Sequence, residues 1–198
     1  MRIMQGKTFI FFGLVGSGKG TQINLLINLL KAKDGREVVY AYPGKEYREL
    51  VQGSSYAGSL IKESLERGEL QPDTITNAIF GHQLMAELKA DVHMIADGYP
   101  RTLNQAENFE ALLKFFKRGT VKIVYITLSE AEAMKRNLLR GRTDDTEEGI
   151  KRRFYEYTTN VVPAMNYFKD KPGYELYEIN GEQSVEDVHG DILKALNL

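Results

Sequence analysis

Short apolar runs alternate along the chain with longer segments in which apolar residues recur every three or four positions. The short runs are rich in Val, Ile, Tyr and Phe, which favours β-strands, whereas the spacing in the longer segments is typical of amphipathic helices. Five strands are expected, at residues 8–12, 38–42, 92–96, 121–126 and 174–179. Strands that alternate with helices predict an α/β fold with a parallel, doubly wound sheet.

The helical segments differ in length, and one is too long for a simple crossover between strands. Ile23, Leu26, Ile27 and Leu30 form the apolar face of the first helix. Further helices are expected at 103–117, 130–140, 146–168 and 185–196. The long segment, residues 45–90, is expected to be divided into three helices by Gly53, Gly58, Gly68 and Pro72. We interpret it as an inserted helical subdomain.

A glycine-rich segment, Gly-Leu-Val-Gly-Ser-Gly-Lys-Gly-Thr-Gln at residues 13–22, joins the first strand to the first helix. Glycines let consecutive backbone N–H groups converge on an anion, and the helix N-terminus adds the positive end of its dipole. Lys19 adds a mobile charge for the outer phosphates, and the hydroxyl that meets Mg²⁺ is displaced to Thr21. The segment therefore predicts a P-loop for a nucleoside triphosphate. Its binding residues are Gly16, Ser17, Gly18, Lys19, Gly20 and Thr21.

A carboxylate and a guanidinium follow the third strand. Asp97 stands at the carboxyl end of that strand, the edge where open α/β sheets bind ligands. Beside a P-loop, this carboxylate is suited to holding Mg²⁺ through water. Arg101, four residues later and fixed by Pro100, is suited to phosphate oxygens.

Composition and charge narrow the class of protein. The 26 basic and 27 acidic residues nearly cancel, so nothing indicates binding to nucleic acid or to an anionic membrane. The absence of cysteine excludes disulfides and cysteine-ligated zinc. The first residues lack a secretory apolar region, and no stretch approaches the ~20 apolar residues of a membrane span. We expect one cytoplasmic domain over residues 1–198, as a monomer.

The Gly-x-Gly-Lys-Gly-Thr-Gln form of the P-loop and the segment 97–102 (Asp-Gly-Tyr-Pro-Arg-Thr) with Gln105 resemble the nucleoside monophosphate kinases, adenylate kinases above all. The segment 67–73 (Arg-Gly-Glu-Leu-Gln-Pro-Asp) is similar to the region of that family that binds the monophosphate. The resemblance implies a P-loop NTPase-type fold with a five-stranded sheet, a helical insertion at about residues 42–90, and Mg²⁺ with ATP.

The resemblance also implies which residues meet the acceptor nucleotide. Arg48 and Arg101 would bind its phosphate, while the backbone at 69–71 and the amide of Gln105 would meet its base. Pro43 stands where the family usually has threonine, and proline offers the base no hydroxyl. The residues placed around AMP are Pro43, Arg48, Glu69, Leu70, Gln71, Gly98, Tyr99, Pro100, Arg101, Gln105, Arg142 and Arg153.

Residues 136–146 resemble a lid (LID) of the short type. Arg136 and Arg140 share one helical face, and Gly141 breaks that helix. The resemblance implies that this arginine pair contacts ATP. It also implies that Arg142 and Arg153 reach the phosphates between the two nucleotides.

Two further assignments follow from the resemblance. Asp144 and Asp145 would hold the arginines in position, and the backbone near Gln183 would meet the adenine of ATP. The residues to which it gives a catalytic role are Lys19, Arg101, Arg142 and Arg153.

The resemblance implies reversible phosphoryl transfer from Mg-ATP to AMP, with ATP, AMP and ADP as the only partners. A UMP/CMP kinase is the alternative, since it also uses a short LID. Gln105 favours adenine, and Pro43 leaves the acceptor base open. A nucleotide-dependent switch would need an Asn-Lys-x-Asp motif, which the sequence lacks. A noncatalytic nucleotide-binding module would have no use for so many arginines directed at phosphate.

Overall fold

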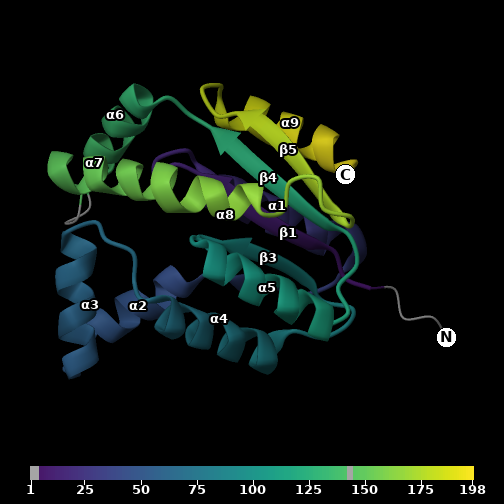
Figure 1. The fold of residues 1–198 in the computed structure, drawn as a ribbon. Helices are drawn as coiled ribbons and strands as arrows, with labels where there is room; N and C mark the ends of the chain where they lie inside the picture. Colours follow the sequence, from purple (N-terminus) through teal and green to yellow (C-terminus); the bar gives the residue numbers. More distant parts are fainter. Residues whose placement is uncertain (1–4, 142–144) are drawn as a thin grey trace.

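The computed structural model describes residues 5–141 and 145–198. The strands are β1 (Thr8–Gly13), β2 (Val38–Ala41), β3 (His93–Asp97), β4 (Val121–Thr127) and β5 (Tyr174–Asn180). All neighbouring strands are parallel, in the order β2-β3-β1-β4-β5 (Figure 1). The predicted α/β class and five-stranded parallel sheet are confirmed. The third strand extends one residue further than expected, so Asp97 is its last residue and pairs in register with Phe11.

Helices cover both faces of the sheet. One face carries α1 (Lys19–Asp34) and α9 (Val185–Leu196), and the other carries α4 (Asp73–Glu87), α5 (Leu103–Phe115) and α8 (Val162–Asn166). Successive side chains of a strand point to opposite faces. In β1, Phe9 and Phe11 therefore pack under α1 and α9, while Ile10 and Phe12 pack toward α5 and α8.

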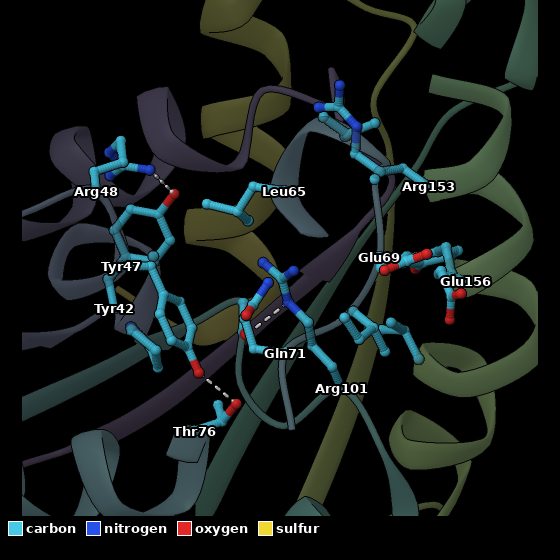
Figure 2. Close-up of a pocket in the computed structure, with 18 of the residues that line it drawn as sticks. Tyr42, Tyr47, Arg48, Leu65, Glu69, Gln71, Thr76, Arg101, Arg153 and Glu156 are labelled. Carbon is cyan, nitrogen blue, oxygen red and sulfur yellow. Dashed lines mark hydrogen bonds between the residues drawn. The ribbon is translucent and has the colours of Figure 1, made fainter. Parts of the chain in front are cut away.

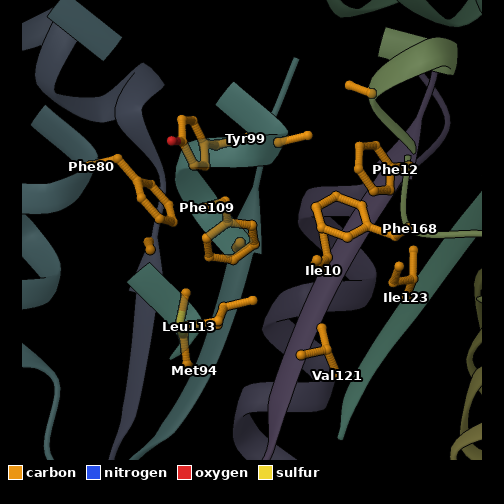
Figure 3. Close-up of a cluster of buried hydrophobic side chains, with 14 of the residues drawn as sticks. Ile10, Phe12, Phe80, Met94, Tyr99, Phe109, Leu113, Val121, Ile123 and Phe168 are labelled. Carbon is orange, nitrogen blue, oxygen red and sulfur yellow. The ribbon is translucent and has the colours of Figure 1, made fainter. Parts of the chain in front are cut away.

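The second of these two cores is rich in aromatic rings (Figure 3). The ring centroids of Phe80 and Tyr99 lie 3.9 Å apart in a stacked pair, and Phe109 meets Phe80 edge-on at 5.2 Å. Each such side chain contributes about 1.5–3 kcal/mol when it is fully buried. The core therefore holds α4 and α5, and the loop that follows β3, firmly against the sheet.

The long helical segment consists of three helices, as expected. They are α2 (Pro43–Gln52), α3 (Tyr56–Glu66) and α4. Gly53 ends α2, but the prediction that Gly58 breaks a helix is wrong, because Gly58 lies inside α3. A Cβ atom at Gly58 would lie 2.2 Å from the Leu50 carbonyl oxygen. The glycine is thus needed for the close contact between α2 and α3.

The expected helix at 146–168 is divided by a π-helical turn. It comprises α7 (Glu147–Glu156), η1 (Tyr157–Val161) and α8. Pro163 lacks a backbone N–H and its ring would clash with the carbonyl four residues earlier. The wider turn that precedes it relieves this conflict, and the Val162 N–H reaches the Tyr157 carbonyl.

The preceding helix, α6 (Glu130–Arg140), ends as expected at Gly141, whose φ of 65° is left-handed. None of the helices within residues 5–141 and 145–198 has the length and apolar character needed to cross a bilayer.

Candidate functional site

The glycine-rich loop after β1 has the conformation that a P-loop requires. Gly16 and Gly18 have φ values of 90° and 85°, which residues with a Cβ atom rarely adopt. A Cβ atom at Gly16 would also lie 2.6 Å from Nδ2 of Asn137. That nitrogen donates to the Val15 carbonyl at 2.9 Å and to the Ala133 carbonyl at 2.7 Å. The fully buried Asn137 of α6 therefore anchors the loop, a role that the sequence analysis missed.

Lys19 begins α1 and turns back onto its own loop. Its ammonium donates to the Gly13 carbonyl at 2.6 Å and to the Leu14 carbonyl at 3.1 Å. Burial lowers the pKa of Lys19 to about 8, although the Asp97 carboxylate acts in the opposite direction. Lys19 is therefore a protonated, poorly solvated cation at neutral pH, available for an incoming phosphate.

Asp97 is 7% exposed and is positioned by a tyrosine from the neighbouring strand. The Tyr40 hydroxyl donates to its Oδ2 at 2.7 Å. Burial and the Asp97 carboxylate raise the pKa of Tyr40, which therefore remains a donor. Within the described part of the chain, Oδ1 of Asp97 has no hydrogen-bond partner and no group of three acidic or histidine side chains could enclose a metal. One such carboxylate fits a hydrated Mg²⁺ that takes its other ligands from water and phosphate.

A cleft of about 740 Å³ lies between the P-loop, the helices α2 to α4, the loop after β3, and α7 (Figure 2). The structure brings many of the predicted residues together along its walls. These are Lys19, Pro43, Arg48, Glu69, Leu70, Gln71, Gly98, Pro100, Arg101, Gln105 and Arg153. Residues from six segments of the chain thus border one space, which is large enough for nucleotide phosphates and a base.

The arginines of the cleft are held by groups of the protein itself. Nε of Arg101 donates to the Gly98 carbonyl at 2.8 Å. The guanidinium of Arg48 lies 5.0 Å from the centre of the Tyr42 ring and donates to its hydroxyl at 3.0 Å. Arg153 donates to the Gly149 carbonyl at 3.2 Å. Each interaction orients a cation along a wall of the cleft.

Two predicted acceptor-side residues have their side chains engaged inside the fold. Gln105 is 1% exposed; its Oε1 accepts from the Arg101 backbone N–H at 2.8 Å and its Nε2 donates to Asp73 at 2.7 Å. The Tyr99 side chain lies in the aromatic core, and its hydroxyl donates to Asn77 at 2.8 Å. Tyr99 therefore has only backbone atoms to offer toward the cleft.

Two of the predicted ATP-binding residues, Arg136 and Gln183, lie at the loop that follows β5. Arg136 donates to the Gly181 carbonyl at 3.1 Å, which links α6 to the loop after β5. A Cβ atom at Gly181 would lie 3.6 Å from the Ser17 carbonyl oxygen, so that loop runs beside the P-loop. Gln183 donates through its side chain to Asn180 and Asp191. Its backbone contact with adenine stays a prediction. The exposed residues of the P-loop are Gly18, Gly20 and Thr21.

Asp145 holds arginines, as expected. Nε and Nη2 of Arg140 form a two-pronged contact with its carboxylate at 2.9 and 2.7 Å. Nη2 of Arg153 reaches the same carboxylate at 3.3 Å. The remaining predicted members of this group, Arg142 and Asp144, lie outside the described residues.

Comparison with known proteins agrees with this geometry. A family model described as "Adenylate kinase" matches residues 11–172. The chain is 32% identical to an adenylate kinase of Prochlorococcus marinus (strain AS9601), over 94% of this chain and 96% of that protein. It is also 32% identical to an adenylate kinase of Leptospira biflexa over 96% of this chain and all of the relative, and 31% identical to one of Oenococcus oeni over 90% and 93%.

Proposed function

Because the chain belongs to the adenylate kinase family, we propose that it transfers the γ-phosphoryl group of ATP to AMP, reversibly, to give two ADP. An ionised oxygen of the AMP phosphate attacks the γ-phosphorus, and the bond from that phosphorus to the bridging oxygen of the leaving ADP breaks. The observation that carries the proposal is that Lys19, Arg48, Arg101 and Arg153 all border one cleft beside the P-loop.

This reaction needs no general base. The second pKa of a phosphate monoester is about 6, so the acceptor is already ionised near neutral pH. The work left to the protein is to position two polyanions and to neutralise their charge. Arg48 and Arg101, on the acceptor side, would orient the AMP phosphate, because planar guanidinium groups bind phosphate oxygens in pairs. Lys19 would meet the phosphates of ATP.

Mg²⁺ bound with ATP would neutralise the β- and γ-phosphate oxygens. Asp97 would hold the ion through a water molecule bound to Oδ1, while Tyr40 keeps Oδ2 occupied. The protonated phenol thereby sets which carboxylate oxygen faces the site.

An acceptor panel tests the proposal. Purified protein is incubated with ATP, Mg²⁺ and AMP, GMP, CMP, UMP or dTMP, and the diphosphates formed are separated and quantified. We expect AMP to be the preferred acceptor. Preference for UMP or CMP would instead establish the pyrimidine alternative. Formation of no diphosphate from any acceptor would refute a monophosphate kinase.

A pair of lysine variants assigns any activity to this cleft. Lys19→Met should abolish most of it, and Lys33→Met, an exposed lysine in the last turn of the same helix, should retain it. Equal activity in the two variants would mean that the P-loop is not the site.

A further inference from the structure

Gln71 lies between α3 and α4 and lines the cleft, yet it is among the buried polar residues of the protein. It is 9% exposed, and Figure 2 shows it in the cleft together with Tyr47, Thr76 and Arg101. The family resemblance implies only a backbone contact here. The hydrogen bonds around the side chain indicate more.

The orientation of the Gln71 amide is determined by Ser64 of α3. Nε2 of Gln71 lies 2.7 Å from the Ser64 hydroxyl oxygen. That hydroxyl has one hydrogen, and it is already directed at backbone carbonyls of its own helix, 2.9 Å from that of Ile61 and 3.2 Å from that of Leu60. With its hydrogen directed at the backbone, the Ser64 oxygen accepts from Gln71, and the amide nitrogen faces α3. The opposite assignment would require the Ser64 hydroxyl to leave its backbone carbonyls in order to donate to Gln71.

The carbonyl end of the amide consequently points away from α3. Oε1 of Gln71 has no hydrogen-bond partner among residues 5–141 and 145–198. It is also absent from the buried polar atoms without a partner in that part of the chain, which are Ser17 Oγ, Asn137 Oδ1 and Tyr157 Oη. Oε1 is therefore not fully enclosed, and the cleft is the space that Gln71 borders.

The neighbouring amide of Gln105 is already bound to protein groups at both ends. Gln105 already uses Oε1 on the Arg101 backbone and Nε2 on Asp73. Gln71 contributes an acceptor that no protein group in the described chain occupies, in the cleft that Arg48 and Arg101 also line. An amide oxygen accepts from an exocyclic amino group, whereas a carbonyl at the same place on a base would oppose it acceptor to acceptor.

We propose that Oε1 of Gln71 is a specificity-determining acceptor that selects an acceptor base with an exocyclic amino group, a 6-aminopurine over a 6-oxopurine. The inference rests on the proposed function. It makes Ser64 a positioning residue, which acts only by keeping the Gln71 amide from turning over.

The test compares AMP with IMP, which carries a 6-oxo group in place of the 6-amino group. The ratio of kcat/KM for AMP to kcat/KM for IMP is measured in the wild type and in Gln71→Met, which keeps the length of the side chain but cannot accept. We expect the ratio to fall about tenfold, as one lost hydrogen bond predicts. The loss should come through AMP, and the KM for ATP should not change. Gln5→Met, an exposed glutamine ahead of β1 that does not line the cleft, is the matched control and should keep the wild-type ratio.

Ser64→Ala provides a second, milder variant that leaves Gln71 in place. Freed from Ser64, the amide can present either end, so the AMP:IMP ratio should fall by about half or more. In the Gln71→Met background the same change should have no further effect. This coupling is not expected of residues that merely support the loop.

An unchanged ratio in Gln71→Met with a native circular dichroism spectrum, or equal losses with AMP and IMP, would overturn the inference. So would independent effects of the two substitutions in the double variant. A wild-type protein that cannot phosphorylate AMP would instead refute the proposed function, which keeps the two failures separate.

Discussion

Replacing Lys19 by methionine should make the protein more stable while it removes the activity. The fold disfavours the Lys19 ammonium, because burial lowers its pKa from 10.5 to about 8. One pKa unit corresponds to about 1.4 kcal/mol, so the ammonium costs the folded state about 3 kcal/mol. Methionine avoids that cost but gives up the contacts with the Gly13 and Leu14 carbonyls, worth about 1 kcal/mol. The free energy of unfolding at pH 7 should thus rise by about 2 kcal/mol.

The pH dependence supplies the sharper test. Between about pH 8 and 10.5 the unfolded chain keeps the Lys19 proton that the folded protein has released. Over this window the wild type therefore gains stability as the pH rises, and Lys19→Met does not. The advantage of the variant is complete below pH 8 and is lost before pH 10.5, because the wild type gains about 3 kcal/mol over this window. Other ionisable groups are shared by both proteins, so their contributions cancel in the difference.

Urea unfolding at pH 7 and pH 9.5, in buffers free of phosphate and sulfate, measures this difference. Oxyanions must be avoided because they bind P-loops and would stabilise the wild type alone. Turnover should fall by about 100- to 1,000-fold, the usual cost of one preorganised donor. Lys33→Met should match the wild type within about 0.5 kcal/mol. A Lys19→Met protein that is less stable at pH 7, or a difference that is the same at both pH values, would refute the argument.

Three further predictions concern groups outside the P-loop. Arg118→Met should lower the free energy of unfolding by about 3 kcal/mol in a urea titration, because the Arg118 guanidinium donates to the Gly6 and Val92 carbonyls. These groups lie at the end of the sheet remote from the cleft, so kcat should not change. Burial lowers the pKa of His93, against the effect of Asp34, so the wild type should lose stability as the pH falls below about 6.5. His93→Gln should lose less, by at most about 1.4 kcal/mol per pH unit, because the lowered pKa of His189 still contributes. Asp145→Asn should reduce kcat about tenfold while circular dichroism stays native, since it removes the charge that orients Arg140; unchanged turnover would contradict that role.

The fold was predictable because its signals are local. Each strand is an apolar run closed by turn residues, and each strand was found close to its expected position. The errors concern residues whose role depends on a distant contact. Gly58 resembles a helix breaker, but its missing Cβ atom serves the approach of the Leu50 carbonyl. The turn that Pro163 imposes on its helix has the same origin, since a proline signals a disruption but not how the chain accommodates it.

The site was predictable where one short segment carries it. Residues 13–22 contain the whole P-loop, and the glycine conformations agree with the pattern. The residues that orient this loop and its carboxylate come from elsewhere. Asn137 is 122 positions from Val15, and Tyr40 is 57 positions from Asp97. Both are polar residues that point into the protein, and a sequence alone does not show which polar residues do so.

The lysine and arginines in and around the cleft are held by partners of different strength, which a nucleotide phosphate must displace. Lys19 and Arg101 are held by neutral carbonyls, and Arg48 is held by a phenol. A dianionic phosphate binds these cations more strongly than such neutral partners do and can replace them. Arg140 is instead held by two bonds to the Asp145 carboxylate. Phosphate groups must bring more negative charge than one carboxylate to compete for that guanidinium, so Arg140 requires a closer approach of phosphate than the other cations do. The contacts with neutral partners therefore yield readily to a nucleotide, whereas the carboxylate-held arginine moves to phosphate only where the phosphate charge outweighs Asp145.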